Sequence, residues 1–296
     1  MLPMNRFSIR DIENLTSIKA HTWRIWEQRY GIGGKQRKES NHRIYDNDDL
    51  KQILRISFLY HAGHKISKIA AFSEAEILSF TLSKGNYKNE YEYYIVRLLE
   101  AAIDMDESRF NEKLKKIWNR IGPEETIVKV IYPFQERVGV LWLTSHLMPA
   151  QEHFTSSLIR NQLCLAIDML PMVTKNSKGK ILLYTPANEH HELPLLLLSY
   201  LLKENNYQVI YVGSNVSDDA IDFYCKHSPD KPSHVLYYLL TNMNALQPQE
   251  YLEAICKNLP DQKVVMAGPL VTFINEMPRN ALLLHSLQET IDFCKA

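Results

Sequence analysis

The chain has 296 residues, 45% of them hydrophobic, and its 34 Lys and Arg residues are balanced by 34 Asp and Glu residues. This length leaves room for two or three domains with packed cores. The four cysteines, Cys164, Cys225, Cys256 and Cys294, contain no Cys-x-x-Cys pair, so neither a disulfide framework nor a zinc site is indicated. We find no signal peptide, and the longest apolar run, residues 193–202, is too short to span a bilayer, so we expect a soluble, cytoplasmic protein.

The first 72 residues have the pattern of a DNA-binding head. Ser8 and Asn14 bracket a short helix, and a second helix opens at Lys19 or Ala20. An apolar stripe lies beside charged positions in this second helix, which predicts that it is half buried and half cationic. The stripe consists of Trp23, Ile25, Trp26 and Tyr30, and the charged positions are Arg24, Glu27 and Arg29.

A basic ribbon follows the second helix. Glycines in residues 31–34 permit a turn, and cations then precede Ile44 and Tyr45, where the chain returns to the core, so we predict a wing. Residues 1–45 hold nine Lys and Arg against four Asp and Glu, which is a net charge of +5 within a neutral chain. A helix in the major groove and a basic wing along the backbone suit DNA binding. A solvated basic face on an ordinary helical domain is the alternative.

Helical patterns continue to about residue 170. A third helix, capped by Asp46 or Asn47, runs to about Ala62 and is followed by a break at residues 63–67. Further helices separated by short joints predict an all-α bundle of four or five helices. They are expected at residues 74–82, 91–103, 107–121, 123–147 and 149–169.

The pattern changes after Pro171, where a polar connector leads into alternating strands and helices. Continuous apolar runs indicate strands that are covered on both faces. The strands are expected at residues 181–184, 208–212, 235–239 and 264–267, and the helices at 193–204, 217–226, 248–258 and 286–294. This alternation predicts a doubly wound, Rossmann-like α/β fold with a parallel sheet, whose ligands bind at the carboxyl ends of the strands. The expected domains are therefore a head (1–75), a helical bundle (76–172) and a sheet domain (178–296).

Two groups of residues are candidates for binding a ligand. Trp142 is followed ten residues later by Glu152 and His153, and these side chains could line a cavity that faces the sheet domain. A structural hydrogen bond between bundle helices is the alternative for Glu152 and His153. The loop after the first strand carries Glu189 and His191, for which an exposed loop histidine is the alternative.

The head resembles the winged helix-turn-helix of the MerR transcription regulators. Their pattern, an aromatic-Ser/Thr-Ile start, then Leu/Trp-Arg-x-Trp-Glu, Arg-Leu/Ile-Tyr and Asp-Leu, is met at every position here. The resemblance implies that double-stranded DNA is the partner, with an inverted-repeat operator if two heads act together. It also implies that Arg24 and Tyr45 contact the DNA backbone, that His21 and Thr22 lie near base edges, and that Arg37, Lys38 and Arg43 sit on the wing.

The order of head, bundle and sheet resembles the photoreceptor repressors that bind adenosylcobalamin, a form of vitamin B12. Their lower-ligand motif is Asp/Glu-x-His-x-x-Gly, so the resemblance implies that His191 ligates cobalt and that Glu189 orients it. By the same resemblance Trp142, Glu152 and His153 cover the adenosyl group, and Gly213 and Gly268, after the second and fourth strands, contact the cofactor. The family implies a homo-oligomer, a dimer or tetramer, that changes its oligomeric state in response to light.

The chain departs from this family at several positions. Pro194 stands where the family has Gly, three residues after the ligand histidine. After the third strand, Tyr238 opens a bulky Tyr-Leu-Leu-Thr stretch where the family has a small Ser-x-Leu/Thr stretch, and Ala267 replaces the first glycine of a Gly-Gly pair. By this resemblance, Pro194 adds a ring where the corrin lies close to the backbone, the Tyr238 stretch fills the slot that holds the nucleotide tail, and the change at Ala267 is smaller.

The sequence therefore leaves three possible functions. The first is a transcription regulator, expected to be a repressor, whose sheet domain binds adenosylcobalamin. The second is a regulator of the same architecture with a cofactor-free sheet domain that another ligand or a protein partner controls. The third is a corrinoid-carrying subunit of a mutase or methyltransferase, against which the basic head argues. No serine, cysteine or paired-carboxylate site suggests catalysis, so we do not expect an enzyme.

Overall fold

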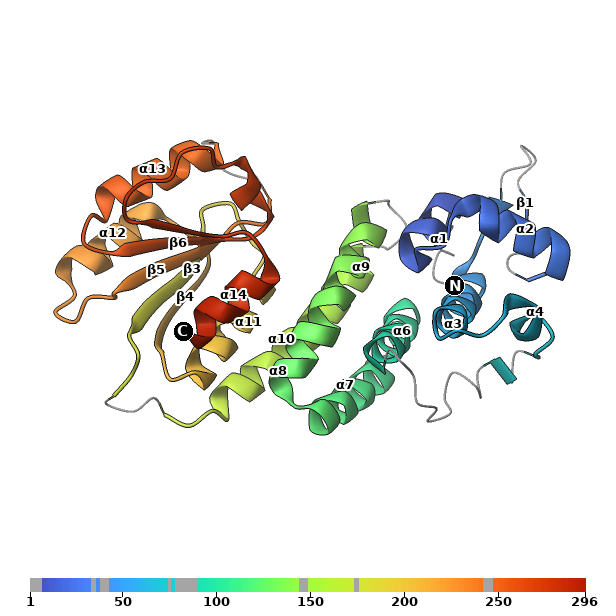
Figure 1. The fold of residues 1–296 in the computed structure, drawn as a ribbon. Coiled ribbons are helices and arrows are strands. Elements are labelled where there is room, and N and C mark those ends of the chain that lie inside the picture. The colour runs from blue at the N-terminus through green and yellow to red at the C-terminus, as the bar shows by residue number, and fades with distance from the viewer. Residues whose placement is uncertain are drawn as a thin grey trace. The chain divides into compact units, whose positions relative to one another are not determined.

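The computed structural model of the chain describes residues 7–32, 36–37, 43–73, 76–77, 90–143, 149–172, 176–241 and 247–296. The chain forms two compact units, Met1–Leu158 and Ile159–Ala296 (Figure 1). The first unit contains the head and most of the predicted bundle, and the second contains the sheet. The predicted domain boundaries at residues 75 and 172 stay predictions. Within the described ranges, no helix is long and apolar enough to cross a membrane.

The head begins with two helices whose ends are specified locally. The Ser8 side chain accepts a hydrogen bond from the Asp11 amide, while the Asp11 carboxylate accepts one from the Ser8 amide, which is a capping box. Asp46 and Asp49 cap the third helix in the same reciprocal way. The elements of the head are α1 (Ile9–Thr16), α2 (Ala20–Tyr30), β1 (Gln36–Arg37), β2 (Arg43–Ile44), α3 (Asn47–His61) and α4 (Ile66–Ile69). β1 and β2 pair antiparallel as the predicted wing.

The predicted apolar stripe of α2 is wrong at one position. Trp23 and Trp26 are buried in the core of the head, but Ile25 is 53% exposed. Successive helix residues are about 100° apart around the axis, so Trp23 and Trp26 share a face that Ile25 does not. Ile25 therefore belongs to the solvent-facing side of α2.

The bundle consists of α6 (Glu90–Ile103), α7 (Glu107–Ile121), α8 (Pro123–Thr126), a π-helical segment (Ile127–Ile131), α9 (Tyr132–Leu143) and the first half of α10 (Pro149–Asp168). Gly122, with φ +83°, ends α7, and Pro123 starts α8 at a position where its missing N–H costs nothing. The helix expected at residues 123–147 is thus interrupted by a π turn. Most of the helix expected at residues 74–82 lies outside the described residues.

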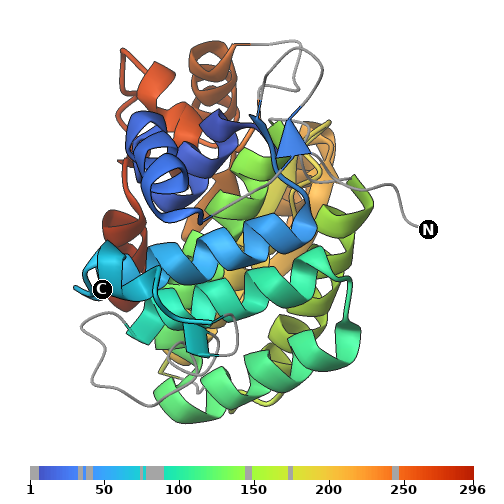
Figure 2. The ribbon, with the colours of Figure 1, turned by 90° about the vertical axis from the view of Figure 1, so that its right-hand side faces the viewer.

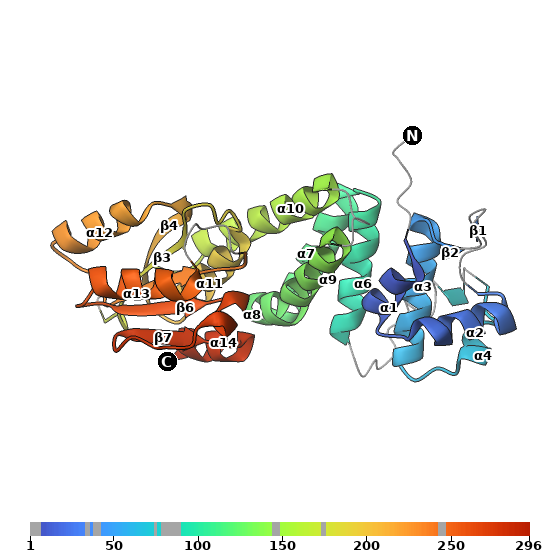
Figure 3. The same ribbon diagram turned by 90° about the horizontal axis from the view of Figure 1, so that it is seen from above.

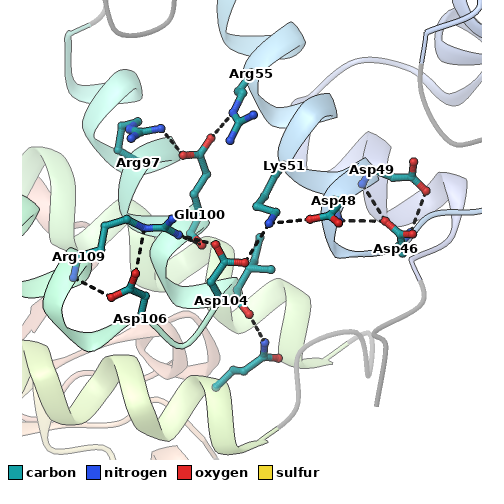
Figure 4. Close-up of polar contacts among 12 residues, drawn as sticks. Asp46, Asp48, Asp49, Lys51, Arg55, Arg97, Glu100, Asp104, Asp106 and Arg109 are labelled. Atoms are coloured by element: carbon teal, nitrogen blue, oxygen red, sulfur yellow. Dashed lines mark hydrogen bonds and ion pairs between the residues drawn. The ribbon is translucent and has the colours of Figure 1, made fainter. Parts of the chain in front are cut away.

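A chain of ion pairs joins the head to the bundle (Figure 4). Glu100 of α6 is 2% exposed, and its carboxylate pairs with Arg97 on the same helix and with Arg55 of α3, whose Nε lies 2.6 Å from Oε1. Near the C-terminal end of α6, Asp104 binds Lys51 of α3 at 3.0 Å and Arg109 of α7 at 2.6 Å. Figure 2 shows α3 lying along α6. Head and bundle are therefore packed together through charged side chains as well as apolar ones.

The second unit is the expected doubly wound parallel sheet. Its strands are β3 (Lys180–Pro186), β4 (Gln208–Val216), β5 (His234–Tyr238), β6 (Lys263–Ala267) and β7 (Ala281–Leu284), in the order β4-β3-β5-β6-β7. β7 is a fifth strand that the sequence pattern missed. The covering elements are α11 (Leu193–Glu204), α12 (Asp218–His227), α13 (Pro248–Asn258), a 3-10 turn (Pro269–Phe273) and α14 (Leu287–Lys295). α12 and α13 pack on one face, and α11 and α14 lie together on the other (Figures 1 and 3).

The strand order reverses at the boundary between β3 and β5. The chain leaves β3 toward β4 at one edge and returns from β4 to β5 on the other side of β3. β3 and β5 are neighbours, but the loop after β3 leads to α11 on one face of the sheet and the loop after β5 leads to α13 on the other. The position between these two loops is the topological switch point, where ligands of such sheets bind. Glu189 and His191 lie in the first of these loops.

Gly268 closes the end of β6 through a close backbone contact. Its φ is +108°, and a Cβ added there would lie 2.3 Å from the Leu239 carbonyl oxygen and 3.1 Å from Cε1 of Tyr238. The Leu239 amide also donates to the Ala267 carbonyl at 3.0 Å. The missing side chain thus lets the loop after β5 pack directly on the end of β6.

We predict that Gly268→Ala destabilises the chain by about 3 kcal/mol, because it adds a backbone clash to a φ that suits glycine. Gly213→Ala is the matched control, since Gly213 also has a positive φ, +102°, but the atom nearest to an added Cβ, Cε1 of Tyr211, would be 3.9 Å away. The control should lose only about 1–2 kcal/mol. Urea unfolding followed by circular dichroism measures both losses, and equal losses would contradict the role given to the Leu239 contact.

Candidate functional site

The solvent-facing side of α2 is polar and cationic. His21, Arg24, Gln28 and Arg29 are exposed there, and Thr22 is half-buried. On the opposite side, the Trp23 indole N–H donates to Thr16 Oγ1 at 3.1 Å, which fixes the helix against α1. The fold therefore presents His21, Thr22 and Arg24 as the sequence predicts. Their contacts with DNA stay predictions.

Glu27 connects α2 to the wing. Its carboxylate accepts hydrogen bonds from Arg43 Nε and from the Tyr45 hydroxyl. Tyr45 is 1% exposed, and burial together with the Glu27 hydrogen bond raises the pKa of its hydroxyl well above the usual value. The structure therefore places Tyr45 in the core of the head, where it holds the base of the wing, and its predicted backbone contact stays a prediction.

The wing itself is described only at its base. Arg37 and Arg43 are directly opposed in the β1–β2 pair. The side chain of Arg37 and the whole of Lys38 lie outside the described residues. Of the predicted wing cations, Arg43 alone has a described side chain, and that side chain is ion-paired with Glu27.

Glu152 and His153 are neighbours at the start of α10. Glu152 accepts a hydrogen bond from Ser156 at 2.5 Å and lies 2.9 Å from His153 Nδ1. The His153 side chain is 78% exposed and that of Glu152 is 28% exposed. Trp142 belongs to α9, but its side chain lies outside the described residues. The structure thus brings Glu152 and His153 together, and the cofactor contacts expected of all three residues stay predictions.

The Glu189 carboxylate accepts five hydrogen bonds from residues that the structure describes. Its side chain is buried, and one carboxylate oxygen accepts the His191 amide at 3.0 Å and His191 Nδ1 at 2.5 Å. The other oxygen accepts the amides of Leu240 and Thr241, at 3.0 and 2.8 Å, and the Thr241 hydroxyl at 3.1 Å. One carboxylate therefore orients His191 and ties the loop after β3 to the loop after β5.

These hydrogen bonds keep Glu189 ionised. Burial acts to raise the pKa of the carboxyl, but the hydrogen bonds from His191 and Thr241 outweigh it and lower the pKa to about 2. An ionised carboxylate only accepts, so Nδ1 of His191 donates to it, and Nε2 is the nitrogen that carries the lone pair whenever the ring is neutral. The His191 side chain is 44% exposed. A histidine oriented in this way by a carboxylate is the usual arrangement of a metal-ligating imidazole.

The C-terminal end of β4 is hydrogen-bonded to the same loop. The Asn215 amide donates to the Glu189 carbonyl at 3.0 Å and lies 3.0 Å from Thr185 Oγ1, and the Asn215 side chain accepts the Asn188 amide at 2.8 Å. Gly213, with a positive φ, precedes this contact. Sequence reasoning missed Asn215, Thr185 and Thr241, because their role depends on the register between strands.

Pro194 and Tyr238, at which the chain departs from the family pattern, both have described positions. Pro194 occupies the first turn of α11, where proline is compatible with the helix. Tyr238 is 8% exposed and lies against Gly268, whose open side is also filled by the Leu239 backbone. The donor set of His191 and Glu189 fits a corrinoid, and Leu239 and Tyr238 fill only the side of Gly268 on which a Cβ would lie. Cofactor contacts of Gly213 and Gly268 stay predictions.

Comparisons with known protein families match the head and the helical bundle. Residues 7–76 match the family model of the MerR HTH family regulatory protein, and residues 94–163 match the family model of the B12 binding domain. The chain is 26% identical to the HTH-type transcriptional repressor CarA of Myxococcus xanthus, over 73% of this chain and 71% of CarA. It is 24% identical to the repressor CarH of the same organism, over 71% of each chain.

The fold is also found among solved structures. The monomethylamine corrinoid protein of Methanosarcina barkeri matches 67% of this chain and 95% of its own, with a TM-score of 0.54 and 16% identity, and thus shows the same fold. The predicted architecture of helix-turn-helix head, helical bundle and Rossmann-like sheet is confirmed. The chain is therefore a DNA-binding regulator that joins a MerR-type head to a B12 sensor.

Proposed function

We propose that this chain is a cytoplasmic transcriptional repressor that binds double-stranded DNA through α2 and the wing, and that adenosylcobalamin bound at His191 controls this binding. The observation that carries the proposal is the Glu189 carboxylate, which holds His191 Nδ1 at 2.5 Å at the switch point of the sheet. The similarity to two repressors supports the sign of regulation. We infer no catalytic activity, because regulation requires only binding.

The head is proposed to bind DNA in the manner of a winged helix. Arg24 is exposed on α2 and would neutralise a phosphate, while His21 and Thr22 occupy the N-terminal turn, which lies closest to base edges in such complexes. Arg37, Lys38 and Arg43 would follow the backbone from the wing. Tyr45 serves this surface by holding Glu27 and the wing base, since its hydroxyl is already bound.

The sensor is proposed to hold cobalt through Nε2 of His191, with Glu189 fixing the tautomer and the orientation of the ring. When bound, adenosylcobalamin supplies a cobalt–carbon bond that light can break. The contacts expected of Trp142, Glu152, His153, Gly213 and Gly268 with the cofactor belong to the same proposal. Glu189 joins the loops after β3 and β5 to the C-terminal end of β4, so His191 is held in a fixed position.

Regulation is proposed to be a shift between oligomeric states. A ligand can only favour a state that it binds more tightly, so the cofactor must bind one oligomer, a dimer or tetramer, better than the other. An oligomer presents several heads to an inverted-repeat operator, and this raises the apparent affinity for DNA. If the cofactor no longer favoured that oligomer, the oligomer would dissociate and its heads would leave the operator.

We predict that Arg24→Ala weakens binding to all DNA sequences, because one phosphate contact is lost. The magnitude of the negative slope of log K, the association constant for DNA, against log salt should fall by about 1 per chain. Lys115→Ala, which removes an exposed cation from α7, should change neither quantity. Fluorescence anisotropy with a labelled duplex at several salt concentrations measures both. An unchanged slope for Arg24→Ala would contradict the phosphate contact.

We predict that His191→Ala abolishes cobalt ligation by the protein, whereas His190→Ala, at the neighbouring exposed loop position, preserves it. The measurement is the absorption spectrum of protein mixed with adenosylcobalamin in the dark and then desalted. Affinity for B12 should fall about 10-fold or more in His191→Ala. DNA binding by the cofactor-free protein should be unchanged, which shows that the head is intact. The same retained spectrum in both variants would exclude His191 as the ligand.

A further inference from the structure

We propose that Ile25 and Gln28 of α2 recognise A·T base pairs, Ile25 through the thymine methyl group and Gln28 through the adenine edge. The proposal rests on the proposed role of α2 in the major groove and adds to it the bases that are read. It starts from an exposed apolar side chain on a helix face that is otherwise polar and cationic.

The geometry of α2 separates this face from the core. Trp23 and Trp26 are 1% and 6% exposed and anchor the helix, whereas Ile25 is 53% exposed. α2 packs on α1 and lies on the side of the head away from α6 (Figures 1 and 3). Ile25 and Gln28 are three residues apart, so their side chains are neighbours on one helix face. The head thus presents an isoleucine and an amide side by side to solvent.

The charge of this face suits DNA. The sequence of α2, AHTWRIWEQRY, contains one carboxylate, Glu27, which is 11% exposed and already paired with Arg43 and Tyr45. Arg24 and Arg29, which flank Ile25 and Gln28 in sequence, are exposed. No negative charge of α2 therefore faces outward unpaired, and a phosphate on either side of the groove would meet a cation.

The chemistry of the pair matches one base pair type. In the major groove, an A·T pair presents the thymine C5 methyl, which prefers apolar contacts, and adenine N6 and N7, which a glutamine amide can bind with two hydrogen bonds. Residues three apart on a helix have Cβ atoms about 5–6 Å apart, and base pairs rise about 3.4 Å each. Ile25 and Gln28 can therefore meet the two edges of one A·T pair or of two adjacent A·T pairs.

The test begins with selection of the preferred site from random duplexes by the full-length wild-type chain. Each thymine of that site is then replaced by deoxyuridine, which removes only the methyl group, and each adenine by 7-deazaadenine, which removes only the N7 acceptor. One uracil substitution should weaken wild-type binding about fourfold, and one deaza substitution about fivefold or more. Ile25→Ala should be insensitive to that uracil, and Gln28→Ala to that deazaadenine.

Arg24→Ala provides the control that separates this inference from the proposed function. It should bind every duplex more weakly but keep the full response to uracil and to deazaadenine. If the wild type binds no duplex, the role of α2 in DNA binding fails. If the wild type binds DNA but selects no A·T pair, or if Ile25→Ala and Gln28→Ala retain the wild-type responses, base reading by this pair is overturned. Because both side chains are exposed, circular dichroism should show unchanged folding in either variant.

Discussion

The buried carboxylate of Glu189 is the interaction on which the sensor half depends. An isolated charge inside a protein is costly, and it persists only where hydrogen bonds replace the water that it has lost. Glu189 obtains those bonds from the loop that follows β3 and from Leu240 and Thr241 after β5. Its own carbonyl accepts the Asn215 amide, near the C-terminal end of β4. The orientation of His191 is therefore a property of three strand ends together, and it does not rest on the local loop alone.

A second buried carboxylate, Glu100, has a comparable role in the other unit. It lies between Arg97 of its own helix and Arg55 of α3, so a shift of the head along α6 would separate Arg55 from the buried carboxylate. Asp104 adds a second connection between the same two helices through Lys51. Such pairs contribute modestly to net stability compared with an apolar contact of equal size, but breaking one partner is costly. They therefore favour one particular packing of head on bundle.

The sequence was sufficient for features that are encoded locally. A strand run and a helix cap such as Asp46 are each specified by residues close together in sequence, and so is the hydrogen bond between Glu189 and His191. It was insufficient where the answer depends on distant partners. Thr241 reaches Glu189 from 52 positions away, and β7 is a four-residue strand recognisable only by its place beside β6. The prediction that Ile25 belongs to the buried stripe is wrong because an apolar side chain need not be buried. Its position around the α2 axis places it on the solvent-facing side of the helix.

The ion pairs between α3 and α6 also affect which spacing of DNA half-sites the protein can bind. A head on a flexible tether could reach half-sites over a range of distances. Here the head belongs to the same compact unit as the bundle, and Arg55 and Lys51 fasten it there. In an assembly formed through the bundles, the distance and the rotation between two α2 helices would be set by the bundle interface. The geometry of the oligomer would then determine the spacing of the half-sites, counted in turns of the DNA helix.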